Sequence, residues 1–241
     1  MIATDYHDTF NTCAPEEGAA VSDRRNDNDG RRSETAATAK VRFPFAVAWT
    51  IAEELRETLA PASERIVIAG SLRRRKPDVG DIELLYIPRV VPLRDPDDMF
   101  ADRTANLADL VIRYLESVGA LERRKNVNGS EMFGPKNKLM RHVRSGINVD
   151  LFAATPENWF NYLVCRTGPA ESNMRIATAA QARGWKWNPY GAGFSVAAVS
   201  DRRDADDGRR SETAATVLAV HSERAVFEFA GLEYREPWER R

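Results

Sequence analysis

Cysteine and histidine are scarce in this chain. Its 241 residues include two cysteines, Cys13 and Cys165, and three histidines. Neither a disulfide framework nor a zinc site with the usual ligand spacing can be built from so few and such widely separated side chains. We therefore expect a reducing compartment, and the cytoplasm is the default.

Long apolar runs are also missing. No stretch reaches the roughly 18 consecutive apolar residues that a membrane-spanning helix needs. Residues 1–5 lack the basic-then-apolar order of a secretory signal. We expect no membrane partner, and a length of 241 residues suffices for one large domain or two small ones.

The chain has almost no net charge, since 35 lysines and arginines face 36 aspartates and glutamates. General adhesion to nucleic acid through a wholly basic surface is therefore not expected. One segment is unbalanced, because residues 121–144 contain only two glutamates beside their lysines and arginines. This asymmetry favours a local site for a polyanion.

Residues 1–41 are poor in large apolar side chains, and we expect a mobile polar arm. The arm contains residues 22–38, which recur as residues 200–216 with three differences over 17 positions. We interpret the repeat as a duplicated linker whose second copy is inserted. The alternative is a pair of arms that grip a nucleic-acid backbone through Arg-Arg pairs, although nearby acids weigh against it.

Hydrophobic periodicity predicts an α+β fold in which helices pack on a small mixed sheet. The predicted helices are residues 43–60, residues 106–118, one beginning at Thr155-Pro156, one ending near residue 183, and residues 223–230. The predicted strands are residues 65–69 and 81–87 and a hairpin of residues 139–143 and 147–153, with a proline-rich loop at 88–98.

The stretch at residues 66–86 has the strongest chemical pattern. An apolar run ends in Gly70-Ser71, four cations follow at residues 73–76, and the next apolar run carries Asp81 and Glu83. Residues i and i+2 of a strand share a face, so the two acids project together. A glycine-serine turn followed by cations suits a triphosphate, because backbone N–H groups and a hydroxyl can approach phosphate closely.

A third acid, Asp150, lies in the middle of an apolar strand pattern. A lone carboxylate is costly there unless it is paired or bound to metal. Three converging carboxylates suit Mg²⁺, and two such ions are the usual machinery of displacement at phosphorus. Each part alone is commonly structural: an Asp-x-Glu pair is usually a solvated strand face, and a basic turn is usually only a turn. The ordered set is far more specific than its parts.

That set resembles the nucleotidyltransferase superfamily. Four further stretches look like the palm, third-acid strand, thumb and C-terminal signature of family X, the DNA polymerase beta-like enzymes. They are residues 79–83, residues 148–152, residues 166–169 with 173–175, and residues 229–234 with 237–240. The resemblance covers roughly residues 42–241, and it implies a minimal form without the family's N-terminal lyase and helix-hairpin-helix regions.

The resemblance implies a domain organisation and a set of site residues. Residues 42–155 would form the palm, and residues 156–241 a thumb-like subdomain interrupted by the second repeat copy. The carboxylates that would bind two Mg²⁺ or Mn²⁺ ions and act in catalysis are Asp81, Glu83 and Asp150. The residues that would bind the nucleoside triphosphate are Gly70, Ser71, Arg74, Gly80, Gly168 and Asn173. The residues expected to hold phosphates of a DNA primer or primer–template are Lys136, Lys138 and Arg141.

Two departures from the family pattern stand out. Glu83 occupies the position where most members have aspartate, so the side chain that reaches the metal is longer. The second repeat copy interrupts the thumb, and its removal would join residues 194–199 to residues 217–220 as a tight hairpin.

The leading hypothesis is metal-dependent nucleotidyl transfer to a nucleic-acid 3′-hydroxyl with release of pyrophosphate. One alternative is transfer to another acceptor, such as a protein, a small molecule or a tRNA end. A further alternative is a non-catalytic nucleic-acid-binding protein on the same scaffold, against which the presence of all three acids argues.

Overall fold

The computed structural model describes residues 41–95, 98–126, 128–196 and 216–240. These residues fall within one compact unit, Lys40–Arg241. Residues 1–40 of the expected polar arm and residues 200–215 of the second repeat copy lie outside the described residues. Among the residues that are described, no helix combines the length and apolar character that crossing a membrane would require.

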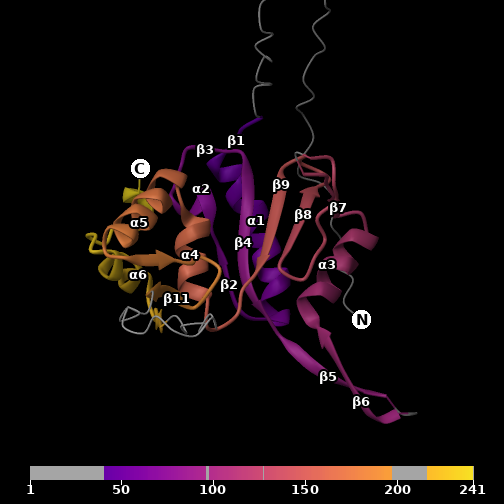
Figure 1. The fold of residues 1–241 in the computed structure, drawn as a ribbon. Helices are drawn as coiled ribbons and strands as arrows, with labels where there is room; N and C mark the ends of the chain where they lie inside the picture. The colour runs from indigo at the N-terminus through magenta and orange to yellow at the C-terminus, as the bar shows by residue number, and fades with distance from the viewer. Residues whose placement is uncertain (1–40, 96–97, 127, 197–215, 241) are drawn as a thin grey trace, which may run out of the picture. The chain divides into compact units, whose positions relative to one another are not determined.

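A five-stranded mixed sheet forms the centre of the fold (Figure 1). Its strands, in spatial order, are β2 (Ser63–Ile68), β4 (Asp81–Pro88), β9 (Asn148–Ala153), β8 (Asn137–His142) and β7 (Leu121–Arg123). Strands β4 and β9 run parallel, and the other neighbouring pairs run antiparallel. The predicted strands and the predicted hairpin are confirmed, and so is the α+β class.

Two helices cover one face of this sheet. They are α1 (Phe45–Leu59) and α3 (Leu107–Ser117). Helix α1 begins directly after Pro44 and buries Ile51, Leu55 and Leu59 at helical spacing. Asn106 caps α3, because its side-chain oxygen accepts a hydrogen bond from the Asp109 N–H at 3.1 Å. Both helices were predicted from the same periodicity.

Strand β4 shows how the sheet separates core from site. Ile82, Leu84 and Tyr86 are fully buried and join the core formed with α1 and α3. Successive side chains of a strand point to opposite faces, so Asp81 and Glu83 project from the other face. On that other face, Leu85 and Ile87 are buried in a further cluster with α4, and Asp81 and Glu83 lie beyond it towards the start of the strand.

The predicted loop at residues 88–98 is wrong. Residues Val90–Asp95 form strand β5, which pairs antiparallel with β6 (Asp98–Asn106). Figure 1 shows this hairpin extending beyond the end of the central sheet. Pro92 lies opposite Thr104 within the hairpin. A two-stranded ribbon has an open edge on each strand, where a proline without an N–H removes no ladder hydrogen bond.

A second hydrophobic core lies in the C-terminal part of the chain. Its elements are α4 (Trp159–Thr167), α5 (Ala170–Ala182), β10 (Trp185–Trp187), β11 (Gly193–Val196), β12 (Thr216–Ala219) and α6 (Glu223–Ala230). Helix α4 begins at Trp159, three residues after Pro156, the predicted first helical residue, and four after the predicted cap, Thr155. Asn158 accepts a hydrogen bond from the Thr155 N–H at 2.8 Å, and residues 156–158 form a turn instead of a helical start.

The strands on either side of the second repeat copy pair with each other. Gly193 lies opposite Ala219, and Val196 lies opposite Thr216. This antiparallel pairing confirms the hairpin that the inserted-linker interpretation requires. Thr216, the last residue of the repeat, is already part of β12.

Five short elements complete the described fold. They are β1 (Phe43–Pro44), which pairs with β3 (Asp78–Val79), the single helical turn α2 (Gly70–Arg73), and the 3₁₀ turns η1 (Ala60–Ala62) and η2 (Pro237–Glu239).

Candidate active site

The parallel pairing of β4 and β9 brings the predicted acids together. Glu83 lies directly opposite Asp150, and Asp81 lies opposite Asn148. Since residues opposite each other in a ladder share a face, Asp81, Glu83 and Asp150 occupy one side of two neighbouring strands. Each of the three carboxylates lies close enough to affect the electrostatics of another.

Glu83 is the most strongly perturbed of these acids. Burial raises the pKa of its carboxyl group to about 8, and the negative charges of Asp81 and Asp150 add to this rise. Arg166 and Arg74 act in the opposite direction but do not outweigh burial. A carboxyl group with this pKa is mostly protonated at neutral pH, so a cation bound nearby would favour its ionised form.

Gly70 makes room for Glu83. A Cβ atom built at position 70 would lie well inside van der Waals contact with Glu83 Oε2, and the Gly70 φ angle is +62°. Only glycine adopts that backbone angle readily while leaving this space open. Gly70 therefore has a role beyond the predicted approach of phosphate. Because it has no side chain, it leaves the space that the Glu83 carboxylate occupies.

Asp150 has a partner that the sequence did not predict. Arg124, which follows β7, donates from Nη2 to Asp150 Oδ1. Burial raises the pKa of Asp150, and the hydrogen bond and the charge of Arg124 lower it in part. The basic segment at residues 121–144 was the only sequence signal that pointed towards Arg124.

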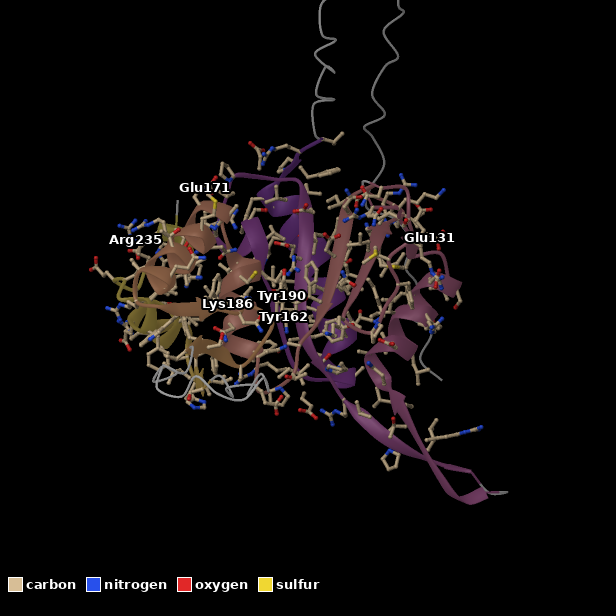
Figure 2. The ribbon with its side chains drawn as sticks, viewed as in Figure 1. Glu131, Tyr162, Glu171, Lys186, Tyr190 and Arg235 are labelled. Carbon is tan, nitrogen blue, oxygen red and sulfur yellow. The ribbon has the colours of Figure 1, made fainter. Side chains whose placement is uncertain are left out.

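A second unpredicted arginine approaches the acids from the thumb. Arg166, near the end of α4, stacks on Phe152 with its guanidinium carbon 3.7 Å from the ring centroid. Tyr162 and Tyr190 flank it, and Figure 2 shows these two tyrosines beside each other. Phe152 follows Asp150 on the same face of β9, so the stack holds a positive charge next to the carboxylates. Burial raises the pKa of both Glu83 and Asp150, and the charge of Arg166 offsets part of that rise.

Three of the predicted nucleotide-binding residues meet at the junction of α2 and α4. Arg74 Nη1 donates to the Thr167 carbonyl oxygen. A Cβ atom at Gly168 would lie 3.2 Å from Arg74 Nη1, so this glycine lets the guanidinium pass close to the chain. Ser71 Oγ is buried and has no hydrogen-bond partner among the described residues.

The other two predicted nucleotide-binding residues lie on either side of this junction. Gly80 is buried immediately before β4. Asn173, on α5, donates from Nδ2 to the Cys165 carbonyl oxygen at 2.9 Å. Its Oδ1 is buried, and no hydrogen-bond partner for it occurs in the described part of the chain. Asn173 thus keeps an acceptor for a ligand.

The four consecutive cations do not all face a common anion, which corrects the sequence interpretation. Arg73 turns to the thumb, where Nη1 donates to Thr167 Oγ1 at 2.7 Å and Nη2 pairs with Glu223. Arg240 Nη2 binds the same glutamate at 2.9 Å. Arg75 lies over the Trp238 ring, 4.3 Å from its centroid. Three of the four cations, Arg73, Arg74 and Arg75, therefore contact the C-terminal part of the chain.

The predicted phosphate contact through Lys138 is wrong. Lys138 is fully buried, and its Nζ lies 2.7 Å from Asp109 Oδ1 and 3.0 Å from the Gly134 carbonyl oxygen. Alternation along β8 explains this, because residue 138 points to the face that α3 covers. Lys136 is exposed and Arg141 is half-exposed beside Glu122, so these two remain predictions for phosphate contacts.

The donor set fits a hard divalent cation in its chemistry. It consists of three carboxylates of like charge on one face, one of them with a strongly raised pKa. Within residues 41–240, apart from the gaps in the description, no three acidic, histidine or cysteine side chains converge closely enough to form a metal site. Arg124 holds Asp150 from one side, and Glu83 lies back against Gly70.

Comparisons with known proteins agree with this architecture. Residues 162–241 match the family model described as DNA polymerase beta thumb. Two solved structures of Leishmania infantum polymerase beta share the fold at 20% sequence identity. The ternary P/T complex aligns with a TM-score of 0.60 over 83% of this chain and 77% of that chain. The ternary gap complex aligns with a TM-score of 0.58 over 83% of this chain and 71% of that one. No curated protein matches the chain by sequence.

The chain thus has a DNA polymerase beta-like fold, with a palm-type sheet followed by a thumb-like subdomain. The expected resemblance to family X is confirmed at the level of fold. The boundary between palm and thumb at residues 155 and 156 stays a prediction.

Proposed function

We propose that this protein is a metal-dependent nucleotidyltransferase of the DNA polymerase type. It would add nucleotides to a nucleic-acid 3′-hydroxyl and release pyrophosphate. One observation carries the proposal: Glu83 and Asp150 face each other on parallel strands, on the side where Gly70 and Ser71 begin the turn that contacts the thumb.

Asp81, Glu83 and Asp150 would hold two Mg²⁺ or Mn²⁺ ions. Bound there, the ions would lower the pKa of the attacking hydroxyl and offset the charge of the phosphates. The carboxylates themselves provide a water-poor, negatively charged face. Burial, and after it the negative charges of Asp81 and Asp150, raise the pKa of Glu83, and bound cations would offset both effects.

The nucleotide would lie between α2 and the start of the thumb. Ser71 Oγ and Asn173 Oδ1 are buried polar atoms without partners in the described structure, and both could bind a ligand. Arg74 Nε is in the same situation, while its Nη1 is anchored on Thr167. Anchoring one end of a guanidinium lowers the entropy cost of placing the other end on a phosphate.

DNA is the acceptor that we favour. The Leishmania structures are ternary complexes, one with P/T and one with a gap, and the fold shared with them supports a similar acceptor here. Exposed Lys136 and Arg141 would contact backbone phosphates, which makes binding dependent on salt.

Primer extension tests the proposal. The full chain is incubated with labelled nucleotide and Mg²⁺ or Mn²⁺, on a primer–template and on the single-stranded primer alone. We expect metal-dependent extension that falls at least about 1,000-fold in Asp150→Ala, because the substitution removes a carboxylate from the reacting centre. The matched control is Glu64→Gln, an exposed acid on β2.

Equal incorporation by the wild type and Asp150→Ala would contradict the assignment. Transfer of nucleotide onto protein without any nucleic acid, seen as a mass increase, would favour a different acceptor. DNA binding without turnover in either metal would favour the non-catalytic alternative.

A further inference from the structure

Arg124 lies at the end of a row of residues that crosses four strands. Its backbone N–H donates to the Leu139 carbonyl oxygen at 3.0 Å, which continues the β7–β8 register by one residue. Leu139 lies opposite Asp150, and Asp150 lies opposite Glu83. Register across a sheet fixes the face of every member of such a row. The Arg124 side chain therefore reaches over Leu139 to the acid face.

The neighbouring arginine shows that this direction is specific. Arg123, one residue earlier, points to the other face, where its Nε lies 2.7 Å from Glu116 on α3. Arg124 makes its ion pair with Asp150 instead, and the two side chains are 23% and 15% exposed. A pair so well covered is screened little by solvent, so it constrains both side chains.

The contact involves one oxygen of the carboxylate. Arg124 Nη2 binds Asp150 Oδ1, and this fixes the rotation of the carboxylate about its last bond. Arginine suits this task because its planar guanidinium binds carboxylates in a defined geometry. Mutation of groups that orient a ligand side chain in this way typically costs about 10- to 100-fold in metal affinity or activity.

We propose that Arg124 is a positioning residue for nucleotidyl transfer: by holding Asp150 through Oδ1, it turns Oδ2 towards the reacting centre. The inference rests on the proposed function, which supplies the reaction. It adds a residue from outside the Gly-Ser turn and the three-acid set to the machinery of that reaction.

Steady-state primer extension with the full chain is the first test. We expect Arg124→Gln to lower kcat about 10- to 100-fold, the range found for groups that orient metal ligands, while KM for the nucleotide changes less than about threefold. Arg124→Lys keeps a charged donor and should restore part of kcat. The control is Arg123→Gln, which removes the neighbouring arginine from the opposite face. Equal losses in Arg124→Gln and Arg123→Gln, or a change confined to KM, would overturn the proposal.

Thermal unfolding of the metal-free protein gives a readout that does not depend on activity. Arg124→Gln, Asp150→Asn and the double variant are compared with the wild type in a chelator-containing buffer. Coupled residues should not be additive, so the double variant should unfold no more than about 1 °C below the less stable single variant. Additive shifts in Tm would show that Arg124 does not hold Asp150.

The two tests separate the inference from the proposed function. Extension by the wild type together with additive Tm shifts would reject the role of Arg124 alone. Coupled Tm shifts in a protein that extends no primer in either metal would reject the proposed function, and with it any role for Arg124 in a reaction. If Arg124→Gln fails to fold, Arg124→Lys supplies both the kinetic and the thermal comparison.

Discussion

The carboxylate of Glu83 occupies the space that a side chain at Gly70 would need. Two residues of the sequence pattern that seemed to serve different ligands, one phosphate and one metal, thus depend on each other. Any side chain at position 70 must displace Glu83, and the positive φ angle of Gly70 adds backbone strain.

Gly70→Ala should therefore lose activity and stability together. We expect a loss of about 2–4 kcal/mol in the free energy of unfolding, which combines strain at positive φ with overpacking against Glu83. Gly119→Ala is the matched control, since Gly119 has a φ of +72° but nothing within 4 Å of its added Cβ. Chemical denaturation of both variants measures the difference, and equal losses would show that contact with Glu83 is unimportant.

Metal-free stability should depend on pH through Glu83. Its folded-state pKa of about 8 lies above the ordinary value of 4.5, so the folded protein retains a proton that the unfolded chain releases. Stability is therefore lost as pH rises between these two values and changes no further above them.

Glu83→Gln removes that titration. Its gain in stability over the wild type should be small near about pH 5 and reach roughly 2–4 kcal/mol near about pH 8.5, an order-of-magnitude conversion of the raised pKa. Denaturation in the presence of a chelator at both pH values measures the gain. The same gain at both values would mean that Glu83 is not buried as described.

The shared glutamate between palm and thumb should stabilise the fold at neutral pH. Burial raises the pKa of Glu223, but hydrogen bonds and charges from Arg73 and Arg240 outweigh it and lower the pKa overall. A lowered carboxyl pKa stabilises above the ordinary value of 4.5, and this contribution disappears as pH falls through the folded-state pKa.

Glu223→Gln should cost about 2–4 kcal/mol at neutral pH, because it leaves two largely covered guanidinium groups without their counter-ion. The deficit should shrink in acid, where the wild-type glutamate is protonated as well. Glu228→Gln, at an exposed position of the same helix, is the control. A deficit that persists unchanged in acid would argue against the ion pairs as its cause.

Lys138 and Lys136 should separate stability from DNA binding. Lys138→Met leaves Asp109 without its partner and should destabilise the protein by about 3 kcal/mol while the affinity for DNA stays the same. Lys136→Ala should leave stability unchanged and weaken DNA binding. Because one phosphate contact is lost, the slope of log affinity against log salt concentration should become shallower by about one. Unfolding curves and DNA titrations at two salt concentrations measure both effects. A loss of DNA affinity in folded Lys138→Met would contradict the assignment.

Much of the palm could be predicted from the sequence, because strand alternation is a local property. Ile82 and Leu84 alternate with Asp81 and Glu83, and this pattern requires only that one face of the strand be buried. The errors have equally local causes. Prolines at 88 and 92 suggested a loop, yet Pro88 ends β4 and the two-stranded β5–β6 ribbon tolerates Pro92. Asn158 competes with Thr155 for the start of α4.

The sequence by itself determined the types of residue at the site: three acids, a glycine-serine turn and nearby arginines. Only the tertiary structure decided their partners, because those depend on register between strands that are far apart in the chain. The β7–β8–β9 register places the Arg124 side chain against Asp150. The order of the strands places the Lys138 side chain in the core, beside Asp109. Register is set by the packing of whole strands, so no local pattern contains it.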